Sequence, residues 1–303
     1  NEVDRNIWSY RGDTLMFRQP KTFFATINYQ DIGATKLIPP LLDRFDVAIE
    51  TGPSHPVRKR LIRRGIDEDI LKDRELSQHL IETILQNNQT GSADQLVDYI
   101  NQKSEDFKEE LEARFRREGI EIEIPRLAEL DAIKEEVLEL PISEDVELLM
   151  DYLGQEVYCH YTLQKEFSRC DGCHYINYIC SDLFNISNRA EQSIYKYSKA
   201  LAWISGDEEA TLEHLMAIIP YALWQRSTIS DKKRSEVRDV EKSSSDSWYA
   251  VGDILRELKK RWEEHKNYQI EAYTALKKGD AERLKALAQQ IEHSFFQSLV
   301  REL

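Results

Sequence analysis

The chain has 303 residues, of which 41% are hydrophobic and 32% charged, with only 11 glycines and 8 prolines. This length is enough for two or three compact units, and this composition favours helices over strands. The formal net charge of -14 argues against a general binder of the nucleic-acid backbone, because such a protein needs clustered Lys and Arg.

The first 50 residues contain the strand-like segments. Residues 22–27 (TFFATI) form a compact apolar run rich in β-branched and aromatic side chains, and residues 45–50 (FDVAIE) form another. A loop with Gly and Pro, residues 31–40, and a short helix, residues 41–44, lie between them. The order strand, loop, helix, strand is typical of an α/β unit, and nothing downstream repeats it.

Residues 56–130 are expected to be helical and strongly charged. Apolar residues recur there at intervals of three, four or seven, namely Leu96, Ile100, Phe107, Leu111 and Phe115. The segment 120–125 (IEIEIP) is compatible with a short strand or with a charged helix end. The basic run 57–64 (VRKRLIRR) is interpreted as a solvated helix face rather than a nucleic-acid contact, because acidic residues follow it at once.

A second helical block is expected over residues 143–227. Two apolar faces mark two successive helices, the first with Ile194, Tyr197, Leu201 and Ile204, and the second with Leu212, Leu215, Met216, Ile219 and Leu223. Gly206 and Asp207 form a helix stop followed by a start signal between them.

The C-terminal part begins with a polar, serine-rich stretch, residues 230–247, which we interpret as a linker or mobile loop. Beyond it, apolar residues in a seven-residue repeat predict a helical hairpin with a turn at residues 277–282; they are Trp248, Val251, Leu255, Leu258 and Trp262, then Leu284, Ile291 and Phe295. Packing within the protein is preferred over an intermolecular coiled coil, because the heptads are few.

All four cysteines lie within one short window with the spacing C-x10-C-x2-C-x6-C; they are Cys159, Cys170, Cys173 and Cys180. An Asp-Gly turn inside the C-x2-C pair lets two thiolates face one ion, and the two flanking cysteines complete a tetrahedral set. Structural Zn²⁺ is the first interpretation, and an iron–sulfur cluster or unligated thiols are the alternatives.

The segments 23–31 (FFATINYQD) and 37–46 (LIPPLLDRFD) together resemble the signature of MoxR-type AAA+ ATPases. In that family an apolar strand ends at a polar residue that senses the γ-phosphate of ATP, and the resemblance places Asn28 there. It places Arg44 where the family has an arginine finger, which acts on the nucleotide of the neighbouring subunit. The resemblance therefore implies a ring, expected to be a hexamer.

The opening residues NEVDR resemble the end of the family's magnesium-binding strand, usually DExxR. Glu2 then stands where a glutamate polarises the attacking water, whereas Asn1 replaces an Asp that helps to hold Mg²⁺. No GxxxxGK[ST] phosphate-binding loop occurs in the chain. We expect these residues alone to be inactive, either because the loop lies upstream or because the subunit is degenerate, and the opening in mid-motif favours the first.

Residues 186–207 (ISNRAEQSIYKYSKALAWISGD) resemble a helix of the MoxR lid domain, which places a second nucleotide sensor at Arg189. Arg226, in WQRS, stands where the family has an arginine that couples the lid to the core. Surface ion pairs are the alternative role for these arginines, for example between Arg189 and Glu191 or between Arg44 and Asp43 or Asp46.

Together these features predict a mainly α protein: the end of an α/β AAA+ core (residues 1–50), a charged helical insertion (51–130), a helical lid with a Cys-rich insertion (131–230), and a linker with a C-terminal hairpin (231–303). The resemblance implies ATP and Mg²⁺ as ligands, a remodelling or chaperone activity, and von Willebrand factor A domain proteins as possible partners. Two alternatives stay open, a non-catalytic helical adaptor with an ATPase-like remnant and a McrB-like nucleic-acid motor.

The sequence also bears on location. No apolar stretch reaches the roughly 20 residues of a membrane span, and the N-terminus lacks the layout of a signal peptide. We therefore expect a cytoplasmic protein that makes no contact with a membrane.

Overall fold

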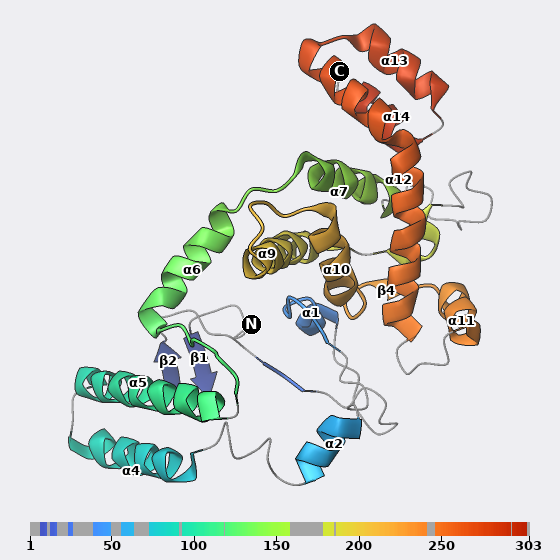
Figure 1. The fold of residues 1–303 in the computed structure, drawn as a ribbon. Helices are drawn as coiled ribbons and strands as arrows, with labels where there is room; N and C mark the ends of the chain where they lie inside the picture. Colours follow the sequence, from blue (N-terminus) through green and yellow to red (C-terminus); the bar gives the residue numbers. More distant parts are fainter. Residues whose placement is uncertain are drawn as a thin grey trace. The chain divides into compact units, whose positions relative to one another are not determined.

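The computed structural model describes residues 7–10, 13–16, 24–26, 39–49, 56–63, 73–90, 93–117, 119–157, 178–184, 186–240, 246–291 and 293–301. These residues fall into two compact units, one within Asn1–Ile49 and Val137–Leu303 and the other within Glu50–Glu136 (Figure 1). Helices dominate both units, so the predicted mainly α fold class is confirmed.

The unit Glu50–Glu136 is built from α2 (Pro56–Arg63), α4 (Arg74–Thr90), α5 (Ala93–Arg117) and most of α6 (Leu127–Glu139). The Asp73 carboxylate accepts the Leu76 amide at 2.8 Å and the Arg114 guanidinium at 3.2 Å, so the residue that begins α4 also ties it to α5. Four residues of the predicted apolar stripe are half-buried in α5; they are Ile100, Phe107, Leu111 and Phe115.

The segment 120–125 is neither the strand nor the helix end that the sequence left open. It is an irregular connection between α5 and α6, in which Ile120 and Ile122 are exposed. The Ile124 amide donates to the Glu112 carboxylate at 2.9 Å, so a side chain of α5 replaces the backbone partner that a strand would need.

The larger unit contains a helical layer with a two-stranded ribbon. Its elements are α7 (Glu144–Val157), η1 (Ile179–Ser181), β3 (Leu183–Phe184), α9 (Asn188–Ser205), α10 (Leu212–Leu223), β4 (Thr228–Ile229) and α11 (Asp231–Val240). Strands β3 and β4 pair antiparallel, with Leu183 opposite Ile229. The core of this layer is formed by Leu149, Leu153, Ile194, Leu215, Ile219 and Leu223.

The predicted end of α9 at Gly206 is confirmed, but the start signal of α10 is Thr211 rather than Asp207. Gly206 adopts the left-handed conformation (φ 77°), which a side chain would disfavour, and its N–H caps the end of α9. Thr211 begins α10 with a capping box completed by His214. The predicted apolar face of α9 is right at Ile194, which is buried, but wrong at Ile204, which is 74% exposed in the last turn.

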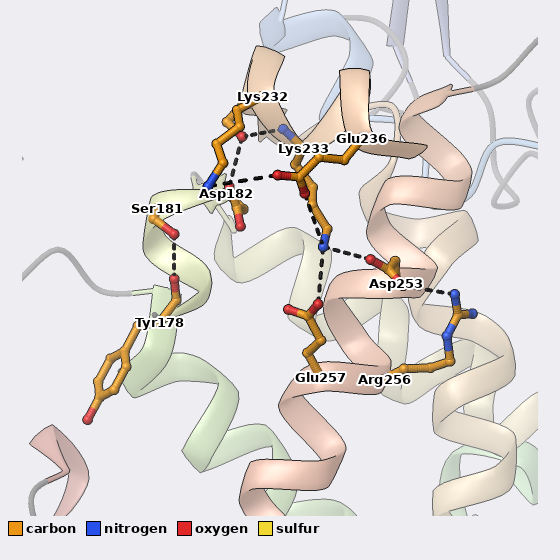
Figure 2. Close-up of polar contacts among 10 residues, drawn as sticks. Tyr178, Ser181, Asp182, Lys232, Lys233, Glu236, Asp253, Arg256 and Glu257 are labelled. Carbon is orange, nitrogen blue, oxygen red and sulfur yellow. Dashed lines mark hydrogen bonds and ion pairs between the residues drawn. The ribbon is translucent and has the colours of Figure 1, made fainter. Parts of the chain in front are cut away.

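Residues 231–240 form helix α11, so the predicted linker is wrong over this range. Ser230 caps the helix by accepting the Lys233 amide at 3.1 Å, and Val237 is buried. The Lys233 side chain points towards α12, where its Nζ lies 2.6 Å from Asp253 and 3.2 Å from Glu257 (Figure 2). These charge pairs explain how so polar a sequence forms a packed helix.

The predicted turn after residue 276 is present between α12 (Asp246–Lys278) and α13 (Ala281–Gln290), but the second arm is not one helix, because α13 ends at Gln290 and a separate helix, α14, spans Ser294–Arg301. The two shorter helices fold together near the end of α12 (Figure 1). The heptad residues Val251, Leu255, Leu258 and Trp262 are buried in the core shared with α7 and α10. Their packing is therefore within the chain, as expected.

Two predicted strands near the N-terminus are not observed where the structure describes them. Phe24–Thr26 is irregular and exposed, and residues 45–49 contain no strand. The Ala48 N–H instead donates to the Tyr221 carbonyl of α10 at 3.0 Å, so this backbone is paired with a helix end. Strands occur elsewhere, as the hairpin β1 (Ile7–Tyr10) and β2 (Asp13–Met16).

Within the described residues, no helix combines the length and the apolar character needed to cross a membrane.

Candidate functional site

The segment 39–49, which contains helix α1 (Pro39–Leu42) and Arg44, lies against the ends of α9 and α10. Besides the Ala48 amide, the Ala48 carbonyl is paired, because it accepts the Trp224 indole N–H at 2.8 Å. The Ala48 side chain packs on the core of the helical layer. We call this set of contacts the joint, because it connects the segment that carries Arg44 to helix α9, which carries Arg189, and to the turn after α10, which carries Arg226.

Arg226 is the central side chain of the joint. It follows the C-terminus of α10 and donates from Nη2 to the Phe45 carbonyl and from Nη1 to the Ser193 hydroxyl at 3.5 Å. Its neighbour Gln225 donates to the same carbonyl at 3.2 Å. Two side chains from one turn therefore converge on one main-chain oxygen of the segment 39–49.

Four charges meet around this contact. Burial lowers the pKa of Arg226, the carboxylates of Asp43 and Asp46 oppose that shift, and the positive charge of Arg189 adds to it. An arginine stays protonated despite such a shift, because its ordinary pKa lies above 12. The structure thus places two guanidinium groups and two carboxylates where the segment 39–49 meets the two helices.

Asp43 contacts the start of α9. The Ser187 hydroxyl donates to the Asp43 carboxylate at 2.5 Å and accepts the Ala190 amide at 3.1 Å. Ser187 is the N-cap residue of α9, with extended backbone (φ -85°, ψ 156°). A carboxylate of the segment 39–49 is therefore hydrogen-bonded to the residue that begins the helix carrying Arg189.

Asp46 contacts the same helix at Ser193, further along its length than Ser187. The Ser193 hydroxyl lies 3.0 Å from the Asp46 carboxylate and 2.8 Å from the Arg189 carbonyl, and its single proton serves one of them at a time. The Lys196 ammonium lies 3.0 Å from the other Asp46 oxygen, but both side chains are substantially exposed, so this pair adds little stability.

The sequence-predicted residues are placed as follows. Arg189 is the second residue of α9 and is exposed, and its charge acts on Arg226. The Arg44 guanidinium donates to the Pro40 carbonyl at 2.9 Å, so it lies along α1, one residue from Asp43. Glu2 and Asn28 lie outside the described residues, so their predicted roles stay predictions.

Sequence reasoning offered Asp43 and Asp46 as ion-pair partners of Arg44, but it missed their hydrogen bonds with Ser187 and Ser193 and their proximity to Arg226. One signal was present, because Ser187 precedes a helical pattern in the position of an N-cap. The acids of LLDRFD gave no indication of their partners, which lie more than 140 residues away in the chain.

Of the four cysteines, the structure describes Cys180 alone, which is half-buried in η1. Cys159, Cys170 and Cys173 lie outside the described residues, so the predicted metal site stays a prediction. Among the residues that are described, no group of three or more His, Cys, Asp or Glu side chains could hold a metal ion.

Residues 181–245 match the AAA lid domain family. This range includes α9, α10 and α11, together with Ser187, Arg189 and Arg226. The match supports an AAA+ ATPase as the class of protein to which this part of the chain is similar. Comparisons with curated proteins and with solved structures found no match.

Proposed function

We propose that this chain is the lid-bearing part of a MoxR-like AAA+ ATPase that remodels other proteins with energy from ATP hydrolysis. The observation that carries the proposal is the joint: within a chain similar to an AAA lid domain, Arg226 and Ser187 bind the segment that contains Arg44. A machine that converts hydrolysis into movement needs such a connection between its nucleotide-binding core and its lid.

In this proposal Arg44 and Arg189 have different roles at the nucleotide. Arg44 reaches the nucleotide of the neighbouring subunit and neutralises charge that builds up on the γ-phosphate. Arg189 contacts the phosphates from the lid and reports their state. Arg189 is exposed near the start of α9, so a phosphate can approach its guanidinium group directly. The N-terminus of a helix also favours a bound anion.

The remaining assignments rest on the resemblance. Glu2 polarises the attacking water, Asn28 senses the γ-phosphate, and ATP binds together with Mg²⁺, which neutralises phosphate charge during transfer. The subunits form a ring, expected to be a hexamer, in the cytoplasm, and a von Willebrand factor A domain protein is the expected type of partner. The Cys-rich segment holds Zn²⁺ or an iron–sulfur cluster.

The test uses the full-length gene product. Arg44→Ala should leave nucleotide binding nearly unchanged and abolish steady-state hydrolysis, because the finger acts in the transition state. Mixing this variant with one that cannot bind ATP should restore part of the activity in mixed rings. The control is Arg234→Ala, which removes an arginine paired locally with Asp231 and should keep normal hydrolysis.

Two outcomes would overturn the proposal. The first is a wild-type protein that neither binds nor hydrolyses ATP. The second is an Arg44→Ala variant that hydrolyses ATP at the wild-type rate in rings of normal size.

A further inference from the structure

The contact between Asp43 and Ser187 links the two arginines that the proposed function places at the nucleotide. Asp43 precedes Arg44 directly, and Ser187 lies two residues before Arg189. We infer that Asp43 is a positioning residue, which sets the direction of Arg189 by holding the N-cap of α9. This inference rests on the proposed function, because it concerns how the lid senses nucleotide.

The hydroxyl of Ser187 can hold this position because it has one proton and two lone pairs. The proton goes to the Asp43 carboxylate at 2.5 Å, a distance typical of a charge-assisted hydrogen bond. A lone pair then faces the Ala190 amide at 3.1 Å. Asp43 therefore orients the hydroxyl that caps the helix, and does so from outside the helix.

Arg189 lies in the turn that the Ser187 cap closes. The hydrogen bond from the Ala190 amide back to Ser187 spans the first turn of α9, and Arg189 lies inside that turn. The Arg189 carbonyl in addition lies 2.8 Å from the Ser193 hydroxyl, which Asp46 also contacts. Two hydroxyls that contact carboxylates of the segment 39–49 therefore contact the Arg189 carbonyl and the amide of the next residue, Ala190.

The consequence is mechanical. A shift of Asp43 that accompanies movement of Arg44 pulls on Ser187 and changes the first turn of α9, so the direction of Arg189 changes as well. The reverse also holds, because coupling between two sites is reciprocal. When Arg189 moves onto a phosphate, the strain passes through Ser187 to the residue beside Arg44, and the two subunits that share a nucleotide interface are linked.

The chain contains a second contact of the same chemistry that serves as an internal control. The Ser230 hydroxyl donates to the Asp182 carboxylate at 2.9 Å and accepts the Lys233 amide at 3.1 Å, so it caps α11 as Ser187 caps α9. Asp182 lies beside the start of α11 (Figure 2), far in sequence from the segment 39–49. Loss of this cap should cost stability without any effect on nucleotide sensing.

The experiment compares Asp43→Asn and Ser187→Ala with Asp182→Asn and Ser230→Ala in the full-length gene product. Steady-state ATPase assays give kcat and KM, thermal denaturation gives stability, and hydrogen exchange follows residues 39–49 and 188–193. Asp43→Asn and Ser187→Ala should each lower kcat about tenfold or more with KM changed by less than about threefold, because Arg189 is misplaced in the transition state. The double variant should be no worse than either single variant.

Ser187→Thr retains the hydroxyl and should restore the wild-type kcat. Asp182→Asn and Ser230→Ala should lower the melting temperature by about as much as Asp43→Asn and Ser187→Ala do, but they should leave kcat at the wild-type value. Hydrogen exchange is followed at α11 as well. In the Asp43 and Ser187 variants, exchange should rise at both 39–49 and 188–193, whereas in the control variants it should rise at α11 alone.

The outcomes separate this inference from the proposed function. A wild-type protein without ATPase activity contradicts the proposed function and the inference with it. A wild-type protein with normal activity, combined with equal kcat losses in the Asp43 and Asp182 variants, shows that cap stability alone matters and overturns the inference. Normal kcat in both Asp43→Asn and Ser187→Ala overturns it as well.

Discussion

The Arg226 guanidinium donates to the main-chain carbonyl of Phe45, which lies 181 positions earlier in the chain. A main-chain acceptor is present whatever the side chain at that position, so the contact holds the path of the segment 39–49 rather than one side chain. Because Gln225 shares the same acceptor, removal of Arg226 tests how much of the joint depends on a charged donor.

Arg226→Ala should loosen the segment 39–49 while the helices remain folded. A hydrogen bond from a charged donor contributes about 1.5–3 kcal/mol, and part of that is retained through Gln225. We therefore expect the free energy of unfolding to fall by about 1–2 kcal/mol and hydrogen exchange to rise at Ala48. Urea denaturation followed by tryptophan fluorescence measures the first quantity. Unchanged exchange at Ala48 would show that Arg226 does not hold the joint.

Glu156→Gln should destabilise the larger unit strongly. Glu156 is fully buried, and it accepts both nitrogens of the Arg261 fork and lies 3.3 Å from His293. Burial alone would raise the Glu156 pKa, but the hydrogen bonds from His293 and Arg261 outweigh it and keep the pKa below its ordinary value. Loss of one partner of such a pair costs about 3 kcal/mol or more. Glu263→Gln, an exposed carboxylate on α12, is the control and should be nearly neutral.

Stability should fall as the pH is lowered below about 6.5, because His293 and His265 resist protonation in the folded chain. Burial lowers the pKa of both below the ordinary 6.5, and His293 is stacked between Tyr152 and Tyr178. As the pH falls, the unfolded chain then binds more protons than the folded chain. The stability that comes from keeping these two histidines neutral is therefore fully present above about pH 6.5 and is lost as the pH falls towards their folded-state pKa.

The midpoint of urea denaturation, measured at about pH 7.5, 6.5 and 5.5, checks this expectation, because these values lie above, at and below the ordinary histidine pKa. All five tryptophans lie in the larger unit, so their fluorescence reports on it. Replacement of His293 by Gln should flatten the dependence, whereas His79→Gln, on an exposed position of α4, should not. An equally steep dependence in the His293 variant would assign the effect to other groups.

Lys233→Met should be more harmful than Lys232→Met, although the two lysines are adjacent on α11. The Lys233 side chain is 6% exposed and lies against Asp253 and Glu257, whereas that of Lys232 is 83% exposed. Loss of Lys233 leaves the carboxylates of Asp253 and Glu257 without this shared cation between α11 and α12. We therefore expect Lys233→Met to lower the free energy of unfolding by about 1–2 kcal/mol. The same assay measures both variants, and equal effects would remove the proposed role of Lys233.

Metal content tests the Cys-rich segment. Elemental analysis of anaerobically purified protein should find about one Zn²⁺ per chain, or iron with labile sulfide, since four thiolates complete one site. Cys173→Ser should abolish binding and lower the melting temperature, because metal binding is coupled to local folding. The hairpin α12 to α14 should keep its helices. Protein with neither metal and four freely alkylated thiols would contradict the prediction.

The helical content, the end of α9 at Gly206 and the turn after α12 could be predicted from the sequence, because they depend on neighbours in the chain. The spacing of Val251, Leu255 and Leu258 marks one face of a helix whatever that face contacts, and Gly206 ends a helix by its own backbone preference. The same reasoning failed at α11, where the polar pattern gave no apolar face and charge pairs with α12 stabilise the helix.

The tertiary structure decided what the periodicity does not encode. Residues 45–49 have the composition of a strand, but their backbone groups pair with the end of α10, since a strand forms only where another strand offers partners. Asp43, Ser187 and Arg226 likewise have ordinary polar sequences around them, and it is the fold that brings them together. The sequence by itself determined the segments that become helices through an apolar face of their own and the residues that carry charge. Packing determined which of those charges meet, and with them helix α11, because long-range pairs depend on the path of the whole chain.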